Sequence, residues 1–380
     1  MITPDTLSLL KADERAILRL RALYDRYGYD RYKMSKFEEY DLYVRNKSFL
    51  LSDHIITFTD TSGKLMALKP DVTLSIVKNT KDGLGGVQKL YYDENVYRIA
   101  KSGYGFREIM QVGLECIGEV DTYCLSEVLS LAAESLSLIS DSADDFVLDV
   151  SHMGILSCVL DATGASSDVR RSLLQCVGEK NLHGIDTVSA AAGLSPEACA
   201  CLRTLVGTYG RAAEVLPVLK KLLTDEAGKT ALDELCAVLS LLASEPWYDR
   251  IRLDFSLVND LAYYNGIVFQ GFIRNVPSVI LSGGQYDLLM QKMDKKSGAV
   301  GFAVYPDLLD SLVAEKKQFD VDAVLLYDES SDPFALRDTV RRMADKGLRV
   351  TAQQRLPEKL TYRQLYQMNE SEVVLLEDHA

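Results

Sequence analysis

The chain begins with apolar residues at helical spacing. Asp13 is placed to cap a helix, and Gly28 is placed to end it in a left-handed conformation. The apolar positions of this helix are Ala16, Leu20, Leu23 and Tyr27. We therefore expect the first element to be an amphipathic helix.

After this helix the pattern changes to short runs in which apolar and polar residues alternate, as is typical of β-strands. Turn residues at 60–63 separate the first two runs. The runs lie at 54–59, 64–68, 88–99 and 107–117. Because such closely connected strands pair locally, they predict a largely antiparallel sheet.

Helical spacing replaces the strand pattern from about residue 151 to residue 247. Ser195-Pro196-Glu197 is typical of a helix cap and first turn. One leucine stripe consists of Leu232, Leu235, Leu239 and Leu242. The block 151–247 is therefore predicted to be a helical insertion in a core formed by residues 1–150 and 248–317.

Strand patterns return after the insertion, at 251–255, 267–273 and 278–281, and a helix is expected at 286–293. A strand–helix–strand pattern follows the charged residues 315–317. Its strands are expected at 323–327 and 349–352, its helix at 333–346, and a last strand at 372–376. Residues 318–380 therefore predict a small α/β domain beside an α+β core.

Composition sets limits on function. The 380 residues are 47% apolar and 26% charged, typical of a globular chain, and no run reaches the ~18 apolar residues of a membrane span. The formal charge of −13 disfavours nucleic-acid binding, which needs cations that displace counterions from phosphate. Seven cysteines without a C-x-x-C pair and four scattered histidines indicate neither disulfides nor a metal site. With no secretory signal, a reducing cytoplasm is the expected location.

The strand at 107–117 carries polar residues that could form a binding site. Gln111, Gly113 and Glu115 share one face, whereas the intervening residues form an apolar face. Gly113 would leave room for a small ligand lying on the sheet between an amide and a carboxylate. An ordinary solvent-facing strand surface fits the same pattern.

The segment 68–73 could present a second carboxylate. Asp71 and Thr73 are suited to binding an ammonium group. Pro70-Asp71 before an apolar run is equally typical of a helix start, so a structural cap is the competing interpretation.

Aromatic and glycine-rich segments follow the insertion. Tyr263 and Tyr264 point to opposite faces if the chain is extended, which would place at least one in the core. Asn265-Gly266 is also a good hairpin turn. Residues 282–287 join a strand to a helix, where backbone amides could meet an anion, but they contain no recognised nucleotide motif.

Taken in this order, these segments resemble the core of histidyl-tRNA synthetases, from the first helix to about Leu312. Residues 28–38 resemble motif 1 of class II synthetases, with Ser35 at the usual proline. The remaining matches are 60–73 to the amino-acid-binding segment, 97–115 to motif 2, 257–269 to the histidine-specific segment, and 283–303 to motif 3.

The resemblance implies a pocket for a histidine-like ligand. The residues that match its amino-acid side are Asp71, Thr73, Gln111, Glu115, Tyr263 and Tyr264. Asp71 and Thr73 would hold the ligand's ammonium group. Gln111 and Glu115 would hold its imidazole side or amino group, and the tyrosines would close the pocket. Arg98 is the phosphate-side arginine that remains, a candidate for a residual phosphate contact.

The departures from the synthetase pattern fall on the ATP side. Asn259 stands at an arginine of the histidine-specific segment, and Leu308 at the motif 3 arginine that clamps phosphate. Gln285 replaces an arginine of the glycine turn, and Ala100 and Gly105 replace an acid and an arginine of the motif 2 loop. Losing one preorganised group of this kind typically costs ~100 to 1000-fold in rate.

This combination resembles the regulatory subunits of ATP phosphoribosyltransferase, which are synthetase paralogues of histidine biosynthesis. The resemblance implies a cytoplasmic homodimer without catalysis, cofactor or metal of its own, which binds neither tRNA nor membrane. It would activate a short catalytic subunit in a hetero-octamer and help to make it sensitive to histidine. Residues 318–380 would be a truncated anticodon-binding-like domain. A divergent histidyl-tRNA synthetase and a synthetase-like amino-acid sensor are the alternatives.

Overall fold

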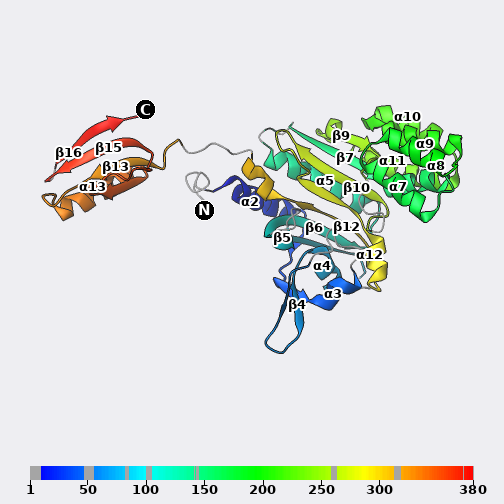
Figure 1. The fold of residues 1–380 in the computed structure, drawn as a ribbon, viewed down its shortest axis with the longest axis horizontal. Coiled ribbons are helices and arrows are strands. Elements are labelled where there is room, and N and C mark those ends of the chain that lie inside the picture. Colours follow the sequence, from blue (N-terminus) through cyan, green and yellow to red (C-terminus); the bar gives the residue numbers. More distant parts are fainter. Residues whose placement is uncertain are drawn as a thin grey trace. The chain divides into compact units, whose positions relative to one another are not determined.

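The computed structural model describes residues 10–46, 55–81, 85–99, 105–140, 142, 145–257, 263–311, 318–370 and 372–379. The chain divides into two units, Met1–Leu312 and Val313–Ala380 (Figure 1). The larger unit contains a nine-stranded and a three-stranded sheet, and the smaller unit contains a four-stranded sheet.

The first described helix is α2 (Ala12–Arg26), and the predicted apolar positions Ala16, Leu20 and Leu23 are buried in it. The fourth predicted position is wrong, because Tyr27 follows the helix and is 38% exposed, whereas Tyr24 is buried.

Gly28 follows α2 with a φ of 75°, in the left-handed region expected of a helix terminator. The predicted cap is wrong, because Asp13 lies inside the first turn. Instead, the Glu14 carboxylate accepts a hydrogen bond from the backbone N–H of Lys11 at 2.8 Å.

The nine-stranded sheet has the order β1-β5-β6-β12-β11-β10-β7-β9-β8. Only β1–β5 and β7–β9 are parallel pairs, which confirms a largely antiparallel sheet. The strands are β1 (Asp30–Arg31), β5 (Val87–Ile99), β6 (Phe106–Gly118), β7 (Phe146–His152), β8 (Tyr209–Gly210), β9 (Ile251–Asp254), β10 (Ile267–Ile273), β11 (Leu281–Gln285) and β12 (Gly298–Val304). The sequence pattern missed β7 and β12, which are buried on both faces and therefore do not alternate.

One face of this sheet is covered by α2 and by α5 (Thr122–Ile139), and both belong to the larger hydrophobic core, which extends into the helical block after β7. Asp121 caps α5 by accepting a hydrogen bond from the N–H of Cys124 at 2.8 Å. By length and composition alone α5 could cross a membrane, but most of it is buried inside the larger unit. Its apolar surface is thus that of a core helix.

On the other face, short elements contribute buried residues to a second hydrophobic cluster. They are α3 (Tyr40–Arg45), β4 (Leu65–Leu68), α4 (Thr73–Asn79) and α12 (Asp287–Lys292). β4 also pairs with β2 (Phe37–Glu39) and β3 (Thr57–Thr59) in the three-stranded sheet. As a result β6 is buried on both sides, and the side chains of Gln111 and Glu115 belong to residues only 4% and 2% exposed. The alternative of a solvent-facing strand surface is therefore wrong.

Six helices fill most of residues 151–247. They are α6 (Met153–Asp161), α7 (Ser167–Gly178), α8 (Leu182–Ala191), α9 (Pro196–Gly207), α10 (Ala212–Leu222) and α11 (Glu226–Leu242), followed by the 3-10 helix η2 (Tyr248–Arg250). Ser195 caps α9 as predicted, and the leucine stripe is buried in α11. The block also contributes β8, which pairs with β9 at the sheet edge.

The smaller unit has the strand order β14-β13-β15-β16. Its elements are β13 (Val321–Leu326), α13 (Pro333–Asp345), β14 (Val350–Gln353), β15 (Tyr362–Asn369) and β16 (Glu372–Asp378). The sequence pattern missed β15, because its residues are mostly polar or tyrosine. This strand nevertheless joins the predicted β13 to the predicted β16.

Candidate functional site

Glu115 lies at the centre of a polar cluster beneath the second hydrophobic cluster. The Thr73 hydroxyl donates a hydrogen bond to its Oε1 at 2.9 Å, and the Tyr286 hydroxyl donates one to its Oε2 at 2.6 Å. In the sheet, Glu115 pairs with Gly301 of β12. A Cβ at Gly301 would lie 1.8 Å from Oε2 of Glu115, so this carboxylate fits only because residue 301 is glycine.

Two carboxylates, Glu115 and Asp71, share this cluster, and each raises the other's cost of ionisation. Burial raises the pKa of Glu115 to about 8, against the hydrogen bonds from Tyr286 and Thr73 and with a smaller contribution from Asp71. Burial also raises the pKa of Asp71, opposed by the Leu74 amide and by Arg98. Both groups would be stabilised in their ionised form by a cationic ligand.

Asp71 has both of the roles considered for it. Its Oδ1 accepts a hydrogen bond from the Leu74 N–H at 2.9 Å, so it caps the first turn of α4. The same carboxylate is electrostatically coupled to Glu115 and Tyr263. The structural and binding interpretations are therefore compatible.

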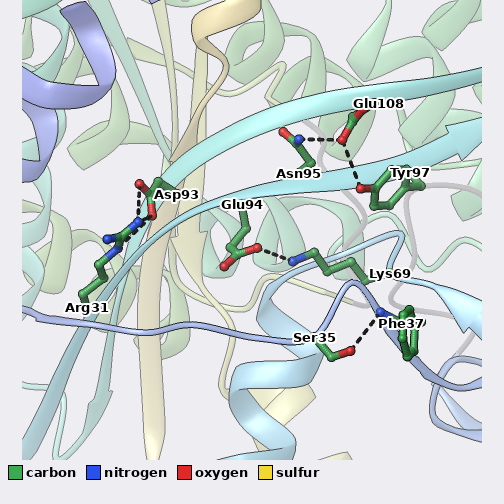
Figure 2. Close-up of polar contacts among 9 residues, drawn as sticks. All are labelled: Arg31, Ser35, Phe37, Lys69, Asp93, Glu94, Asn95, Tyr97 and Glu108. Atoms are coloured by element: carbon green, nitrogen blue, oxygen red, sulfur yellow. Dashed lines mark hydrogen bonds and ion pairs between the residues drawn. The ribbon is translucent and has the colours of Figure 1, made fainter. Parts of the chain in front are cut away.

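The loop before Asp71 is fixed to β5. Lys69 is fully buried, and its Nζ pairs with Oε2 of Glu94 at 2.6 Å (Figure 2). The Tyr97 N–H donates to the Lys69 carbonyl at 2.9 Å, and the Nε of Arg98 donates to the Pro70 carbonyl at 3.1 Å. These contacts hold the Asp71 carboxylate at one place against the sheet.

Further contacts brace the β5–β6 hairpin. Figure 2 shows Asp93 accepting hydrogen bonds from Arg31, and Glu108 accepting from Asn95 and Tyr97. The hairpin that carries Glu115 is therefore held in register by side chains as well as by its backbone ladder.

Arg98 brings a positive charge to the end of β5. Its Nη2 is buried and has no hydrogen-bond partner in the described part of the chain. In register it lies opposite Arg107 of β6, so two cationic side chains face each other across the hairpin. This arrangement suits an anionic group.

Tyr263 and Tyr264 lie on the same side of the sheet, with ring centroids 4.5 Å apart. The expectation of opposite faces does not apply because this segment forms a turn. Tyr263 also contacts Tyr286, with centroids 5.9 Å apart. Burial raises the pKa of Tyr264, so its hydroxyl stays neutral.

Asn265-Gly266 is not a hairpin turn. The Asn265 N–H donates to the Gln285 carbonyl at 3.1 Å, and the Gly266 carbonyl accepts from the Met153 N–H at 2.8 Å. Gly266 lacks the positive φ that a type I′ turn requires at this position. The pair instead fastens the tyrosine segment to β11 and to the start of α6.

The space above Gly113 is filled by protein. A Cβ there would lie 2.5 Å from the Tyr92 hydroxyl and 2.3 Å from the Phe302 carbonyl. The expected ligand room at this glycine is therefore occupied by the Tyr92 side chain. Sequence reasoning missed Tyr92 and Tyr286 as members of the site, although the hairpin register that pairs Tyr92 with Gly113 could have indicated the first.

Three of the positions where the sequence departs from the synthetase pattern lie in the described part of the chain. Leu308 lies in the 3-10 helix η3 (Pro306–Ser311) and packs against the larger core. The Gln285 side chain donates to Oδ2 of Asp287 at 2.7 Å, and Gly105 is a turn residue with a φ of 85°. Asn259 and Ala100 lie outside the described residues.

The strand-to-helix turn at 282–287 is not an anion site. The Asp287 N–H donates to Oδ1 of Asn265 at 2.8 Å, and Oδ1 of Asp287 accepts from the Ala299 N–H at 2.9 Å. The first helical amide is thus already used, and the negative charge of Asp287 beside it disfavours an anion.

A separate cleft of about 1070 Å³ opens at the far end of the β5–β6 hairpin. Its charged lining includes Lys81, Lys89, Lys296 and Glu119. None of the predicted site residues lines it, so it does not belong to the cluster around Glu115.

The comparisons with known proteins agree with this geometry. A family model described as histidyl-tRNA synthetase matches residues 8–309. The chain therefore has the fold of a histidyl-tRNA synthetase-like protein, with a mixed sheet in its larger unit.

An ATP phosphoribosyltransferase regulatory subunit from Caldanaerobacter subterraneus is 30% identical over 290 residues, which cover 75% of this chain and 74% of that protein. This chain belongs to the family of ATP phosphoribosyltransferase regulatory subunits. A crystal structure from Bacillus halodurans, named as an ATP phosphoribosyltransferase regulatory subunit/histidyl-tRNA synthetase, has a TM-score of 0.72 at 25% identity and covers 93% of this chain and 90% of its own.

A solved HisG:HisZ complex of ATP phosphoribosyl transferase from Thermotoga maritima shares the fold. The TM-score is 0.61 at 17% identity, and the match covers 76% of this chain and 96% of that chain.

Proposed function

We propose that this chain is a non-catalytic regulatory subunit that binds a short ATP phosphoribosyltransferase catalytic subunit and activates the first step of histidine biosynthesis. The relatives carry that name, and one fold neighbour is a HisG:HisZ complex. Two observations together support the proposal. Glu115 is held by hydrogen bonds from Thr73 and Tyr286, and Leu308 packs against the core at the position that matches the phosphate-clamping arginine of a synthetase.

The ligand of this site is a histidine-like amino acid. Its ammonium and imidazole groups would bring positive charge to the buried carboxylates of Asp71 and Glu115, with Thr73 and Gln111 beside them. The unpartnered Nη2 of Arg98 suits an anionic group, either the ligand's own carboxylate or a phosphate.

The assembly that we propose is a homodimer of the class II core bound to catalytic subunits in a cytoplasmic hetero-octamer. The core is 1–150 with 248–317, the insertion is 151–247, and 318–380 is a truncated anticodon-binding-like unit. Phe37 of the motif 1 region and Phe58 of β3 form an edge-to-face pair, with centroids 5.6 Å apart, and are 47% and 38% exposed. A dimer would bury this pair.

Feedback requires that histidine bind one assembly state more tightly than another, because a ligand with equal affinity for two states does not shift the equilibrium between them. In this mechanism the chain binds histidine and couples that binding to the activity of the catalytic subunit. The catalytic subunit carries the reaction itself.

The decisive experiment measures phosphoribosyl-ATP formation by a purified short catalytic subunit with and without this chain. A large rise in rate on addition, followed by a histidine titration, supports the proposal. An unchanged rate with no complex on mixing contradicts it and favours an amino-acid sensor with another partner.

Substitutions in the pocket test the ligand separately. We expect Glu115→Ala and Gln111→Ala to abolish the increase in Tm that histidine produces, while the dimer survives. Glu119→Ala, on an exposed residue just after β6, is the matched control and should keep the increase. An unchanged histidine effect in the two pocket variants would show that the ligand binds elsewhere.

A further inference from the structure

The edge strand β16 of the smaller unit lies beyond residue 309, where the family model ends. Figure 1 shows it along one border of the sheet, where among the described strands it pairs with β15 alone. Every second residue of such a strand directs its backbone N–H and C=O away from the sheet. This border therefore presents unused hydrogen-bonding groups.

The middle of β16 is unusually apolar for an exposed edge. Val374, Leu375 and Leu376 are consecutive and 45%, 47% and 52% exposed. The register between β15 and β16 shifts at Leu365/Tyr366, which leaves Leu376 as the extra residue of a bulge. Proteins usually blunt such edges, so an edge with three exposed apolar side chains indicates a surface that a second strand covers.

Acidic residues flank this apolar centre. Glu372 precedes it, and Glu377 and Asp378 follow it. The apolar run of β16 is Val373 to Leu376. An antiparallel second copy that paired this run with itself would put Glu372 of each chain opposite Glu377 of the other. Parallel pairing would put each acid opposite itself. Like charges directly opposite each other are destabilising, so the charges disfavour a second copy.

We propose that β16 binds an extended segment of a different protein, whose apolar residues are flanked by lysine or arginine. The backbone of that segment continues the four-stranded sheet, and its side chains pack on Val374, Leu375 and Leu376. Its basic residues meet Glu372 and the acids after Leu376. Backbone hydrogen bonds would provide affinity, and the charged ends would select the partner.

A peptide probe tests this with the full chain. Fluorescein-labelled Lys-Lys-Val-Ile-Val-Ile-Lys-Lys is titrated with protein and followed by fluorescence anisotropy, beside a peptide with glutamate at the four lysines. We expect the lysine peptide to bind at least ten-fold more tightly and to slow amide hydrogen exchange in residues 372–378. Equal affinity of the two peptides, or no binding of either, overturns the proposal.

Variants locate the contact. The double change Val374→Lys with Leu376→Lys should weaken the lysine peptide at least ten-fold, and Glu372→Lys at least three-fold. Phe334→Lys, at a 75% exposed apolar residue of α13, is the control and should leave affinity unchanged. If the free chain self-associates and the double change abolishes that association, a second copy covers β16 and the proposal is wrong.

Discussion

Glu115 makes the stability of this protein depend on pH, because its carboxyl group is buried near a second carboxylate. Burial raises its folded-state pKa to about 8, above the value in an unfolded chain. The folded state therefore holds this proton more tightly. The resulting stability is fully present below the unfolded pKa and is lost as pH rises through about 8, at up to about 1.4 kcal/mol per pH unit.

Replacing Glu115 by glutamine removes this contribution. We expect the free energy of unfolding of Glu115→Gln to depend less on pH than that of the unchanged chain between pH 5 and 8. Urea unfolding at four pH values measures it. Glu119→Gln, on an exposed carboxylate, should keep the original slope. Parallel curves for Glu115→Gln and the unchanged chain would contradict the assignment.

Ligand binding should move the same proton. A cationic ligand favours ionised Glu115, so histidine is expected to release protons on binding near pH 7. Calorimetric titration in two buffers of different ionisation enthalpy measures the number of protons released per histidine bound. In Glu115→Gln the release should fall, and an identical release would place the titrating group elsewhere.

Some residues of the site could be predicted from the sequence and others could not. Asp71, Thr73 and Glu115 are brought together as the motif order suggested: Thr73 begins α4, Glu115 lies on β6, and Asp71 stands two residues before α4. Tyr92 and Tyr286 were missed because their roles depend on cross-strand register and on a turn. Neither can be read from local alternation.

At the scale of elements, β6 and β12 pack so closely that glycine is required between them. Gly113→Ala would push a methyl group into the Phe302 carbonyl and the Tyr92 hydroxyl, and should destabilise the chain by about 3 kcal/mol. Gly207→Ala is the control: it lies at the end of α9 with no atom within 4 Å of an added Cβ. Thermal unfolding compares them, and equal effects would contradict this packing.

The loop that presents Asp71 depends on a buried ion pair. Lys69→Ala leaves Glu94 without its partner and should cost about 3 kcal/mol, with weaker histidine binding because the loop is released. Lys64 pairs with Glu39 at the same 2.6 Å, but both side chains are half exposed. Lys64→Ala should therefore cost less than about 1 kcal/mol. Chemical denaturation with a histidine titration checks both variants.

Elements were predictable where one face is polar and the other apolar. The β5–β6 hairpin and α11 follow from their periodicity. β12 shows no alternation of apolar and polar residues, because both of its faces are buried. β15 consists mostly of polar residues and tyrosines, and it forms a strand because it pairs with β13 and β16. Tertiary context, which a local window does not contain, decided both.

At the scale of the whole molecule, a net charge of −13 disfavours tRNA binding. Because Leu308 and Gln285 stand at positions that match synthetase arginines on the ATP side, we also expect no histidine-dependent exchange between ATP and pyrophosphate by the purified chain. Asn259→Arg combined with Leu308→Arg should not restore it, because the motif 2 loop still lacks its arginine at Gly105. Measurable exchange by the unchanged chain would make it a divergent synthetase instead.

Leu308 also bears on the history of this fold. Where a synthetase keeps an arginine, this chain has an apolar side chain packed against the larger core. Once neighbouring residues have adjusted to that leucine, a returning arginine must carry its charge into an apolar surface and lose the packing that it replaces. The loss of adenylate chemistry is therefore hard to reverse: a single return to arginine would be destabilising, and recovery would need several coordinated substitutions.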